Sequence, residues 1–241
     1  MTPSEHTRSY YAATARGLVE RPALEGDLQA DVCVVGGGYS GVSVALNLAE
    51  RGYDVVLLEA NRIGWGASGR NGGQVCSAFS AGMEPIARAL GKDDARKLFA
   101  FVEEGKDIIA ERVQRHAIEC DLTWGFLNAA VKPRHVAAMR ETMESWSRDY
   151  GYDHLTLLSR DEALGYLNSP AYIGGLYDAR AGHLHPLTYC LGLARAAEGA
   201  GARLFERSPV LGIELGAAPS ARTAKGRVRA KFLVLCGNAY L

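Results

Sequence analysis

Hydrophobic residues come in short blocks near the start of the chain, and their spacing changes from block to block. Residues 31–36 (DVCVVG) are almost entirely apolar, which is typical of a strand buried on both faces of a parallel sheet. Residues 40–51 place their apolar positions at helical spacing. Gly52 then provides a common helix end, and residues 54–59 (DVVLLE) repeat the buried-strand pattern. This order predicts a βαβ unit.

The rest of the chain alternates between helical and extended patterns. Residues 1–30 are polar and irregular, and we expect them to form an arm lying over the body. Helices are predicted at 92–118, 133–150, 160–167 and 187–199, and strands at 155–158, 171–178, 202–210, 211–215 and 227–236. The pattern indicates an α/β, Rossmann-like domain with an inserted α+β region.

One uncharged stretch has nearly the length of a membrane span. Residues 32–49 contain no charged side chain over 18 positions. The stretch nevertheless contains several glycines and serines, and its period changes from strand to helix in the middle. We therefore expect no membrane span. The N-terminus has no apolar block typical of a signal peptide.

Composition and charge exclude some classes of function. Lys plus Arg equals Asp plus Glu, at 27 each, so no basic excess favours binding to nucleic acid. The five cysteines are scattered and form no C-x-x-C pair, which argues against a disulfide framework or a zinc site. That pattern fits a reducing, cytoplasmic location. We expect no bound metal.

The first predicted strand runs into a glycine-rich turn. Gly36, Gly38 and Gly41 form the pattern G-x-G-x-x-G between the strand and the helix. Gly36 permits the tight turn, Gly38 lets a pyrophosphate approach the backbone, and Gly41 lets the helix pack closely on the strand. The free amides at the helix start favour phosphate. The turn therefore predicts a dinucleotide site.

An acidic residue follows at the expected distance. Glu59 lies eighteen residues after Gly41, at the end of the second predicted strand. There its carboxylate can accept hydrogen bonds from the ribose hydroxyls of an adenosine. A 2′-phosphate at the same place would meet a like charge, so NADP is disfavoured.

A second glycine-rich loop favours a flavin over a nicotinamide. Residues 61–82 contain six glycines, and such a loop is costly in conformational entropy unless it follows a ligand closely. Its central part, GWGASGRNGGQ (64–74), offers polar side chains and many bare amides. Those groups suit a pyrophosphate, a ribityl chain and the edge of a flavin ring.

These motifs together resemble a known family. DVCVVGGGYSG, the acid Glu59 and GWGASGRNGGQ resemble the D-amino-acid-oxidase (DAO) family of FAD-dependent oxidoreductases. The pieces YYAATA (10–15), AGHLHPL (181–187), RTAKGRV (222–228) and CGNAYL (236–241) resemble the branch that oxidises γ-glutamylated putrescine. The resemblance implies an FAD-binding Rossmann-like domain of the GR2 type with a substrate domain.

The resemblance also implies a chemistry. Members of the family oxidise a C–N bond by passing a hydride from the amine-bearing carbon to flavin N5. The imine hydrolyses, and molecular oxygen reoxidises the flavin to give hydrogen peroxide. The expected partners are thus FAD, oxygen and a small amine. Because the cofactor carries the chemistry, the reaction compels no acid–base residue, and the catalytic residues stay unassigned.

Cofactor contacts are carried over position by position. We expect the glycine turn, the helix start and Glu59 to bind the ADP half of FAD. We expect the loop 64–74 to lie along the phosphates and the flavin ring. Val210 matches a position whose backbone meets adenine, and Gly237 and Asn238 follow the last strand. The full set is Gly36, Gly38, Tyr39, Ser40, Gly41, Glu59, Ala60, Ala67, Ser68, Arg70, Asn71, Gly73, Gln74, Val210, Gly237 and Asn238.

Two histidines flank Leu184. On a strand, His183 and His185 would share a face, and they are candidates for a substrate-side or packing role. A metal site is disfavoured because no third ligand lies nearby in the sequence.

The resemblance divides the chain into four parts. We expect an arm at 1–30, a βαβ unit with its flavin loop at 31–90, a partial substrate domain at 91–186, and a return to the cofactor domain at 187–241. Family enzymes are longer, so we expect a truncated chain. The alternatives are a sarcosine- or glycine-type oxidase of the same family and a catalytically inactive flavin-binding fragment.

Overall fold

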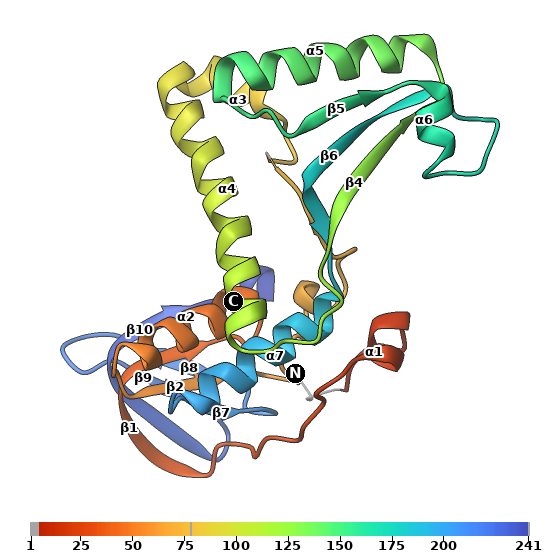
Figure 1. Ribbon diagram of the computed structural model, residues 1–241. Coiled ribbons are helices and arrows are strands. Elements are labelled where there is room, and N and C mark those ends of the chain that lie inside the picture. Colours follow the sequence, from red (N-terminus) through yellow and green to blue (C-terminus); the bar gives the residue numbers. More distant parts are fainter. Residues whose placement is uncertain (1–4, 78, 241) are drawn as a thin grey trace. The chain divides into compact units, whose positions relative to one another are not determined.

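The computed structural model describes residues 5–77 and 79–240, and the chain divides into two compact units (Figure 1). The first unit comprises residues 1–73, 112–120 and 185–241. The second comprises residues 74–111 and 121–184. Compared with the insertion expected at 91–186, the second unit begins earlier and leaves residues 112–120 to the first unit.

The first unit is built on a six-stranded sheet. Its strand order is β7 (Arg203–Phe205), β2 (Val55–Leu58), β1 (Gly26–Val35), β10 (Gly226–Leu235), β9 (Ser220–Arg222) and β8 (Gly212–Glu214). The first four strands run parallel, whereas β9 is antiparallel to both of its neighbours, β10 and β8. β1 has β2 on one side and β10 on the other, so the chain reverses its winding direction at β1. Ligands bind at such switch points in α/β sheets.

The expected N-terminal arm was partly wrong. Strand β1 begins at Gly26 rather than at residue 31, because residues 26–30 pair in parallel with residues 226–230 of β10. A short helix, α1 (Tyr10–Thr14), also lies within the arm, and the Ser9 side chain accepts a hydrogen bond at its start. The polar positions that suggested an irregular segment are the exposed side of a paired strand.

Two helices of the first unit pack on each other. These are α2 (Tyr39–Glu50), between β1 and β2, and α7 (Pro186–Gly199), which leads to β7 (Figure 1). The apolar residues of α2 that the sequence placed at helical spacing are buried. Two single turns of 3-10 helix complete the unit, at Ala67–Gly69 and Asn238–Tyr240.

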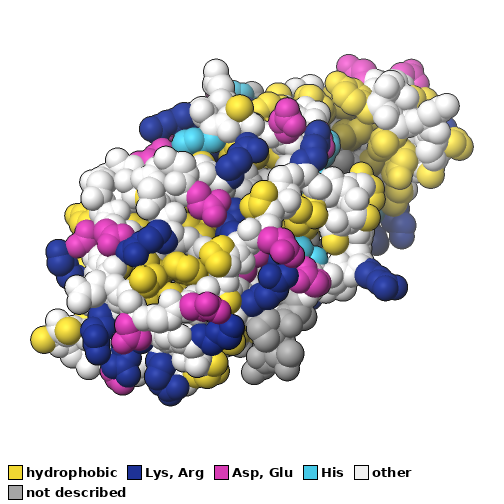
Figure 2. Space-filling view, turned by 90° about the horizontal axis from the view of Figure 1, so that it is seen from below, with side chains coloured by type: hydrophobic (Ala, Val, Ile, Leu, Met, Phe, Trp, Pro, Cys, Tyr) yellow, Lys and Arg dark blue, Asp and Glu magenta, His cyan; other side chains and the backbone are white. Residues whose placement is uncertain are grey.

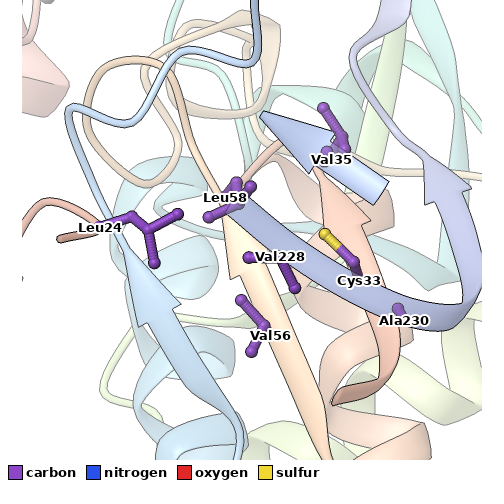
Figure 3. Close-up of a cluster of buried hydrophobic side chains, with 8 residues drawn as sticks. Leu24, Cys33, Val35, Val56, Leu58, Val228 and Ala230 are labelled. Atoms are coloured by element: carbon purple, nitrogen blue, oxygen red, sulfur yellow. The ribbon is translucent and has the colours of Figure 1, made fainter. Parts of the chain in front are cut away.

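Apolar side chains, most of them from the parallel strands β1, β2 and β10, form one core of this unit (Figure 3). The cluster comprises Leu24, Cys33, Val35, Val56, Leu58, Ala221, Val228 and Ala230. Burial raises the pKa of the Cys33 thiol to about 12, so this cysteine is a protonated packing residue at neutral pH. The buried-strand interpretation of residues 31–36 and 54–59 is confirmed.

The second unit is an antiparallel sheet with helices. Its strands are β3 (Gln74–Val75), β4 (Thr123–Ala130), β5 (Leu155–Leu158) and β6 (Gly174–His183). Its helices are α3 (Met83–Leu90), α5 (Pro133–Tyr150), α6 (Arg160–Leu164) and α4 (Lys92–Arg115) up to residue 111. β6 pairs with each of the other three strands. A small core forms around Phe99 and Tyr152.

Local signals explain where the helices of this unit begin and end. α5 has Pro133 in its first turn and Gly151 in the left-handed conformation after its end. α6 begins with a capping box between Ser159 and Glu162. Strand β4 was missed because a glycine with positive φ, Gly125, interrupts its alternation at a bulge.

The surface carries basic and acidic side chains side by side (Figure 2), as the equal numbers of the two in the sequence suggest. Basic and acidic side chains alternate over the face seen in Figure 2. Within residues 5–77 and 79–240, no helix is long and apolar enough to cross a membrane.

Candidate cofactor-binding site

A pocket of about 880 Å³ opens at the carboxyl ends of the parallel strands in the first unit. Its walls come from the segments that follow β1, β2, β7 and β10. The structure thus brings together loops that are far apart in the sequence. The predicted site residues that line it are Gly36, Gly38, Tyr39, Ser40, Glu59, Ala60, Ala67, Ser68, Val210, Gly237 and Asn238.

The glycine turn is crowded by backbone. Gly36 has a φ of +110°, and a Cβ there would lie 2.5 Å from the Cys236 carbonyl oxygen. At Gly41 a Cβ would lie 1.8 Å from the Gly36 carbonyl oxygen. Gly41 therefore does not line the pocket but lets α2 pack against the turn, for the packing reason that the sequence suggested.

The start of α2 meets the second glycine-rich loop. The Tyr39 amide donates a hydrogen bond to Ser68 Oγ at 2.9 Å, and a Cβ at Gly38 would lie 2.9 Å from the same oxygen. The first amides of any helix lack intrahelical acceptors. Ser68 satisfies one of them, so the two glycine-rich segments form a single cradle.

Glu59 holds backbone amides with both carboxylate oxygens. Oε2 accepts from the Gly37 amide at 2.6 Å, and Oε1 accepts from the Asn61 amide at 2.8 Å. Burial raises the pKa of Glu59, while the hydrogen bonds from Asn61 and Gly37 lower it and the nearby charge of Glu206 raises it. A carboxylate has about four acceptor positions, so Glu59 keeps capacity for further donors in the pocket.

The other predicted loop residues do not line the pocket. The Arg70 guanidinium lies 4.3 Å from the centre of the Trp65 ring. The Asn71 side chain donates to the Ala67 and Ser68 carbonyls and accepts from the Gly73 amide. The side chains of Arg70 and Asn71 thus contact other residues of the same loop and stabilise its conformation. Gln74 lies in β3 of the second unit, where it pairs with His183.

Pocket residues that the sequence reasoning missed are neighbours of predicted ones. They are Gly37, Asn61, Trp65, Gly66, Pro209, Leu211, Gly212, Ile213, Cys236 and Tyr240, with the strand-end residues Val35, Leu58 and Leu235. Trp65 and Tyr240 stand edge to face, with ring centres 6.0 Å apart. The direction of each side chain decides such contacts, and the sequence pattern carries no signal for it.

Comparison with known proteins decides the family. A family model described as FAD dependent oxidoreductase (DAO) matches residues 31–241. The chain belongs to the DAO family. FAD is the cofactor of this family, as the flavin loop predicted.

Two curated relatives are similar over nearly the whole chain. The chain is 45% identical to gamma-glutamylputrescine oxidoreductase of Escherichia coli K12, over 99% of this chain and 56% of that protein. It is 40% identical to the probable oxidoreductase OrdL of Haemophilus influenzae, over 98% of this chain and 55% of that protein. The chain therefore spans about half the length of the curated relatives it matches.

Two solved structures share the fold of this chain. An L-amino acid deaminase from Proteus myxofaciens aligns with a TM-score of 0.77 at 24% identity, covering 94% of this chain and 49% of that one. Glycine oxidase from Geobacillus kaustophilus aligns with a TM-score of 0.70 at 25% identity, covering 88% and 56%. The α/β fold predicted from the sequence is confirmed.

The residues of the DAO-family pocket fit a dinucleotide. Bare glycines leave the backbone of the turn open to a phosphate, the N-terminal end of α2 favours negative charge, and a half-buried acid, Glu59, stands at the end of β2. The apolar segment 209–213 also lines the pocket. This combination of donors and apolar surface suits an ADP moiety.

The two histidines do not share a strand face. His183 is the exposed last residue of β6, in the second unit. His185 is buried in the first unit, where its Nδ1 accepts from the Thr188 amide at the start of α7. The shared-face prediction was wrong because the strand ends at His183. In the described part of the chain, no cluster of three or more potential metal ligands occurs.

Proposed function

We propose that this chain forms the FAD-binding part of an amine oxidase, with the pocket of the first unit as its cofactor site. The observation that carries the proposal is the cradle at the start of α2. There the glycine turn, the acid Glu59 and the loop residue Ser68 meet at the carboxyl ends of parallel strands.

The ADP half of FAD would occupy the side of the pocket near β1 and β2. The bare backbone at Gly36 and Gly38 and the first turn of α2 would bind the pyrophosphate. Glu59 would accept from the ribose hydroxyls with the acceptor positions that its two backbone amides leave free. Val210 would present its backbone to the adenine.

The flavin half would follow the second loop. Ala67, Ser68 and Asn238 line the pocket and would contact this half directly. Arg70, Asn71 and Gly73 would support it indirectly, because their contacts hold the loop in shape. Gln74 lies in β3, and we propose that it too contacts the flavin.

The proposed reaction is oxidation of a C–N bond. When bound, FAD would accept a hydride at N5 from the amine-bearing carbon, with oxygen as the final acceptor. The protein would bind and orient the amine in its neutral form, since a protonated amine cannot release the hydride. The named activity of the Escherichia coli relative supports γ-glutamylputrescine as the substrate.

A glycine- or sarcosine-type oxidase is the second candidate. The fold similarity to glycine oxidase and L-amino acid deaminase favours it. It differs from the first candidate in the size of the amine, because γ-glutamylputrescine is a long diamine derivative and glycine is the smallest amino acid.

An anaerobic substrate screen tests the proposal. The 241-residue chain is loaded with FAD and mixed in turn with γ-glutamylputrescine, sarcosine, glycine and L-amino acids, while the flavin absorbance is followed. We expect bleaching by γ-glutamylputrescine and peroxide formation when oxygen is admitted. Bleaching by sarcosine or glycine alone would select the second candidate. Stable yellow colour with no bleaching would identify a flavin-binding fragment.

The cysteines support a proposal about the cellular setting. Within the described residues, none of the five cysteines forms a disulfide. We propose a reducing, cytoplasmic location, where thiols persist, with a small amine and oxygen as the reaction partners.

A further inference from the structure

Glu206 is the most deeply buried charged residue named in the first unit, with 1% of its surface exposed. It directly follows β7 and does not line the pocket. Removing a carboxylate from water costs several kcal/mol. A carboxylate buried this completely needs partners, and its partners lie on the two loops that flank the pocket.

The first loop follows β2. Glu206 Oε1 accepts a hydrogen bond from the Ile63 amide at 2.8 Å, and Oε2 lies 2.6 Å from Arg62 Nε in an ion pair. Ile63 and Arg62 stand between Asn61 and Trp65, which both line the pocket. The Glu206 carboxylate therefore binds the middle of the loop 61–65, and both ends of this loop line the pocket.

The second loop starts at Glu206 itself. Its backbone continues to Pro209 and Val210, which also line the pocket. The two loops are also joined by backbone hydrogen bonds, from the Arg207 amide to the Asn61 carbonyl and from the Ser208 amide to the Glu59 carbonyl, both at 2.8 Å. The contacts of Glu206 with Ile63 and Arg62 add to these backbone bonds between the two loops.

A third segment completes the surroundings of Glu206. The Arg21 side chain, 3% exposed, lies with Nη1 3.6 Å from Glu206 Oε1 and binds Glu198 through two hydrogen bonds of 2.7 Å. Arg21 stabilises the charge of Glu206, while Glu198, on α7, touches neither pocket loop in these pairs. Glu198 therefore offers a matched control.

We propose that Glu206 is a positioning residue for the dinucleotide pocket. Its buried carboxylate holds the loop after β2 against the loop after β7, and so fixes the relative position of two neighbouring segments that would hold the adenosine end of FAD. The inference rests on the proposed cofactor site. Glu206 acts through Ile63 and Arg62 and does not touch the cofactor.

The test compares three variants of the full chain. Glu206→Ala removes the carboxylate, Glu206→Gln keeps an acceptor for Ile63 but loses the charge that faces Arg62, and Glu198→Gln disturbs Arg21 alone. FAD affinity is measured by titration against flavin fluorescence, and the stability of the cofactor-free protein by urea unfolding. Loop opening is measured by amide hydrogen exchange at 59–66 and 206–211.

We expect Glu206→Ala to weaken FAD binding about 10- to 100-fold, and Glu206→Gln to weaken it by a smaller factor. Exchange at both loops should rise in the Glu206 variants. Glu198→Gln should lower the unfolding midpoint, yet leave FAD affinity within about threefold of the unchanged chain. If Glu206→Ala fails to fold, the comparison of the two Gln variants decides.

Two results would overturn the inference. One is equal FAD affinity and loop exchange in the Glu206 variants and the unchanged chain. The other is an equal loss of FAD affinity in Glu198→Gln at equal loss of stability, which would assign the effect to general destabilisation. If the unchanged chain binds no FAD, the proposed function fails, while loop exchange still decides the role of Glu206.

Discussion

Glu59 accepts hydrogen bonds from backbone amides and would also accept them from the cofactor. Its carboxylate accepts from the amides of Gly37 and Asn61, so it organises the glycine turn before any ligand arrives. Burial raises its pKa, which makes ionisation of the empty site costly. Ribose hydroxyls would supply donors that favour the charged form.

Replacement of Glu59 should therefore weaken FAD binding and alter its pH dependence. A lost hydrogen bond to a charged group costs about 1.5–3 kcal/mol, or about 10- to 150-fold in affinity. Only the ionised carboxylate accepts from both hydroxyls, so affinity should fall as the pH drops through the raised pKa of Glu59. FAD titrations of Glu59→Gln and the unchanged chain between neutral and acid pH measure both effects.

The stability of the cofactor-free chain should depend on pH in the opposite direction to its FAD affinity. A carboxyl whose pKa is higher in the folded chain binds more protons there than in the unfolded chain. Glu59 therefore makes the cofactor-free chain less stable as the pH rises from the ordinary glutamate range through its raised pKa. A Glu59→Gln variant with an unchanged pH profile of FAD affinity would contradict the role given to Glu59.

Gly41 and Gly105 give a second, purely steric prediction. A Cβ at Gly41 would overlap the Gly36 carbonyl oxygen at 1.8 Å, whereas a Cβ at Gly105 in α4 would meet nothing within 4 Å. Gly41→Ala should lower the free energy of unfolding by more than about 2 kcal/mol and abolish FAD binding. Gly105→Ala should raise it by up to about 1 kcal/mol because alanine favours a helix. Urea unfolding of the two variants is the measurement, and equal stabilities would contradict the close packing at the turn.

At the scale of elements, α7 depends on a histidine cap. His185 Nδ1 accepts from the Thr188 amide at 3.1 Å, and its Nε2 lies 3.0 Å from Thr14 Oγ1. The Thr14 hydroxyl donates to the Tyr10 carbonyl, so it accepts from Nε2–H of His185. The same ring thus begins α7 and holds α1 to it.

We expect His185→Ala to destabilise the chain by about 0.5–2 kcal/mol through loss of this cap. His183→Ala is the matched control, because His183 is exposed at the end of β6, and its effect should stay within about 0.5 kcal/mol. Urea unfolding followed by circular dichroism compares the two. A larger loss from His183→Ala would mean that His183 carries the structural role.

For the whole molecule, the main prediction concerns linkage between cofactor and stability. A ligand that binds only the folded chain stabilises it by about 2.7 kcal/mol at 100 times its Kd. For a chain of this size the shift in Tm is roughly 2–4 °C per kcal/mol. Added FAD should therefore raise Tm by several degrees in a concentration-dependent manner, while NADP should have no comparable effect. Differential scanning calorimetry of the cofactor-free chain tests this, and an unchanged Tm at saturating FAD would contradict cofactor binding.

The extent of prediction differs between the two units. In the first unit, β1, α2 and β2 were predicted because a buried parallel strand and a packed helix have distinct apolar periods. In the second unit, helix α5 was predicted with its exact bounds, since proline and glycine mark its ends. Strand β4 was missed, and the predicted strand at 202–210 shortened to β7, because pairing partners rather than local pattern define those strands.

The sequence alone predicted the chemistry of the proposed cofactor site. The glycine turn, Glu59 and the loop 64–74 are local features, because glycine acts through its own backbone and a helix start through its own amides. Tertiary structure alone decided that Ser68 reaches the Tyr39 amide, that Arg70 turns to Trp65, and that Glu206 grips Ile63. The contacts of Ser68 and Glu206 join segments far apart in the chain, which only the folded sheet brings within bonding distance, and the Arg70 contact depends on how its loop folds.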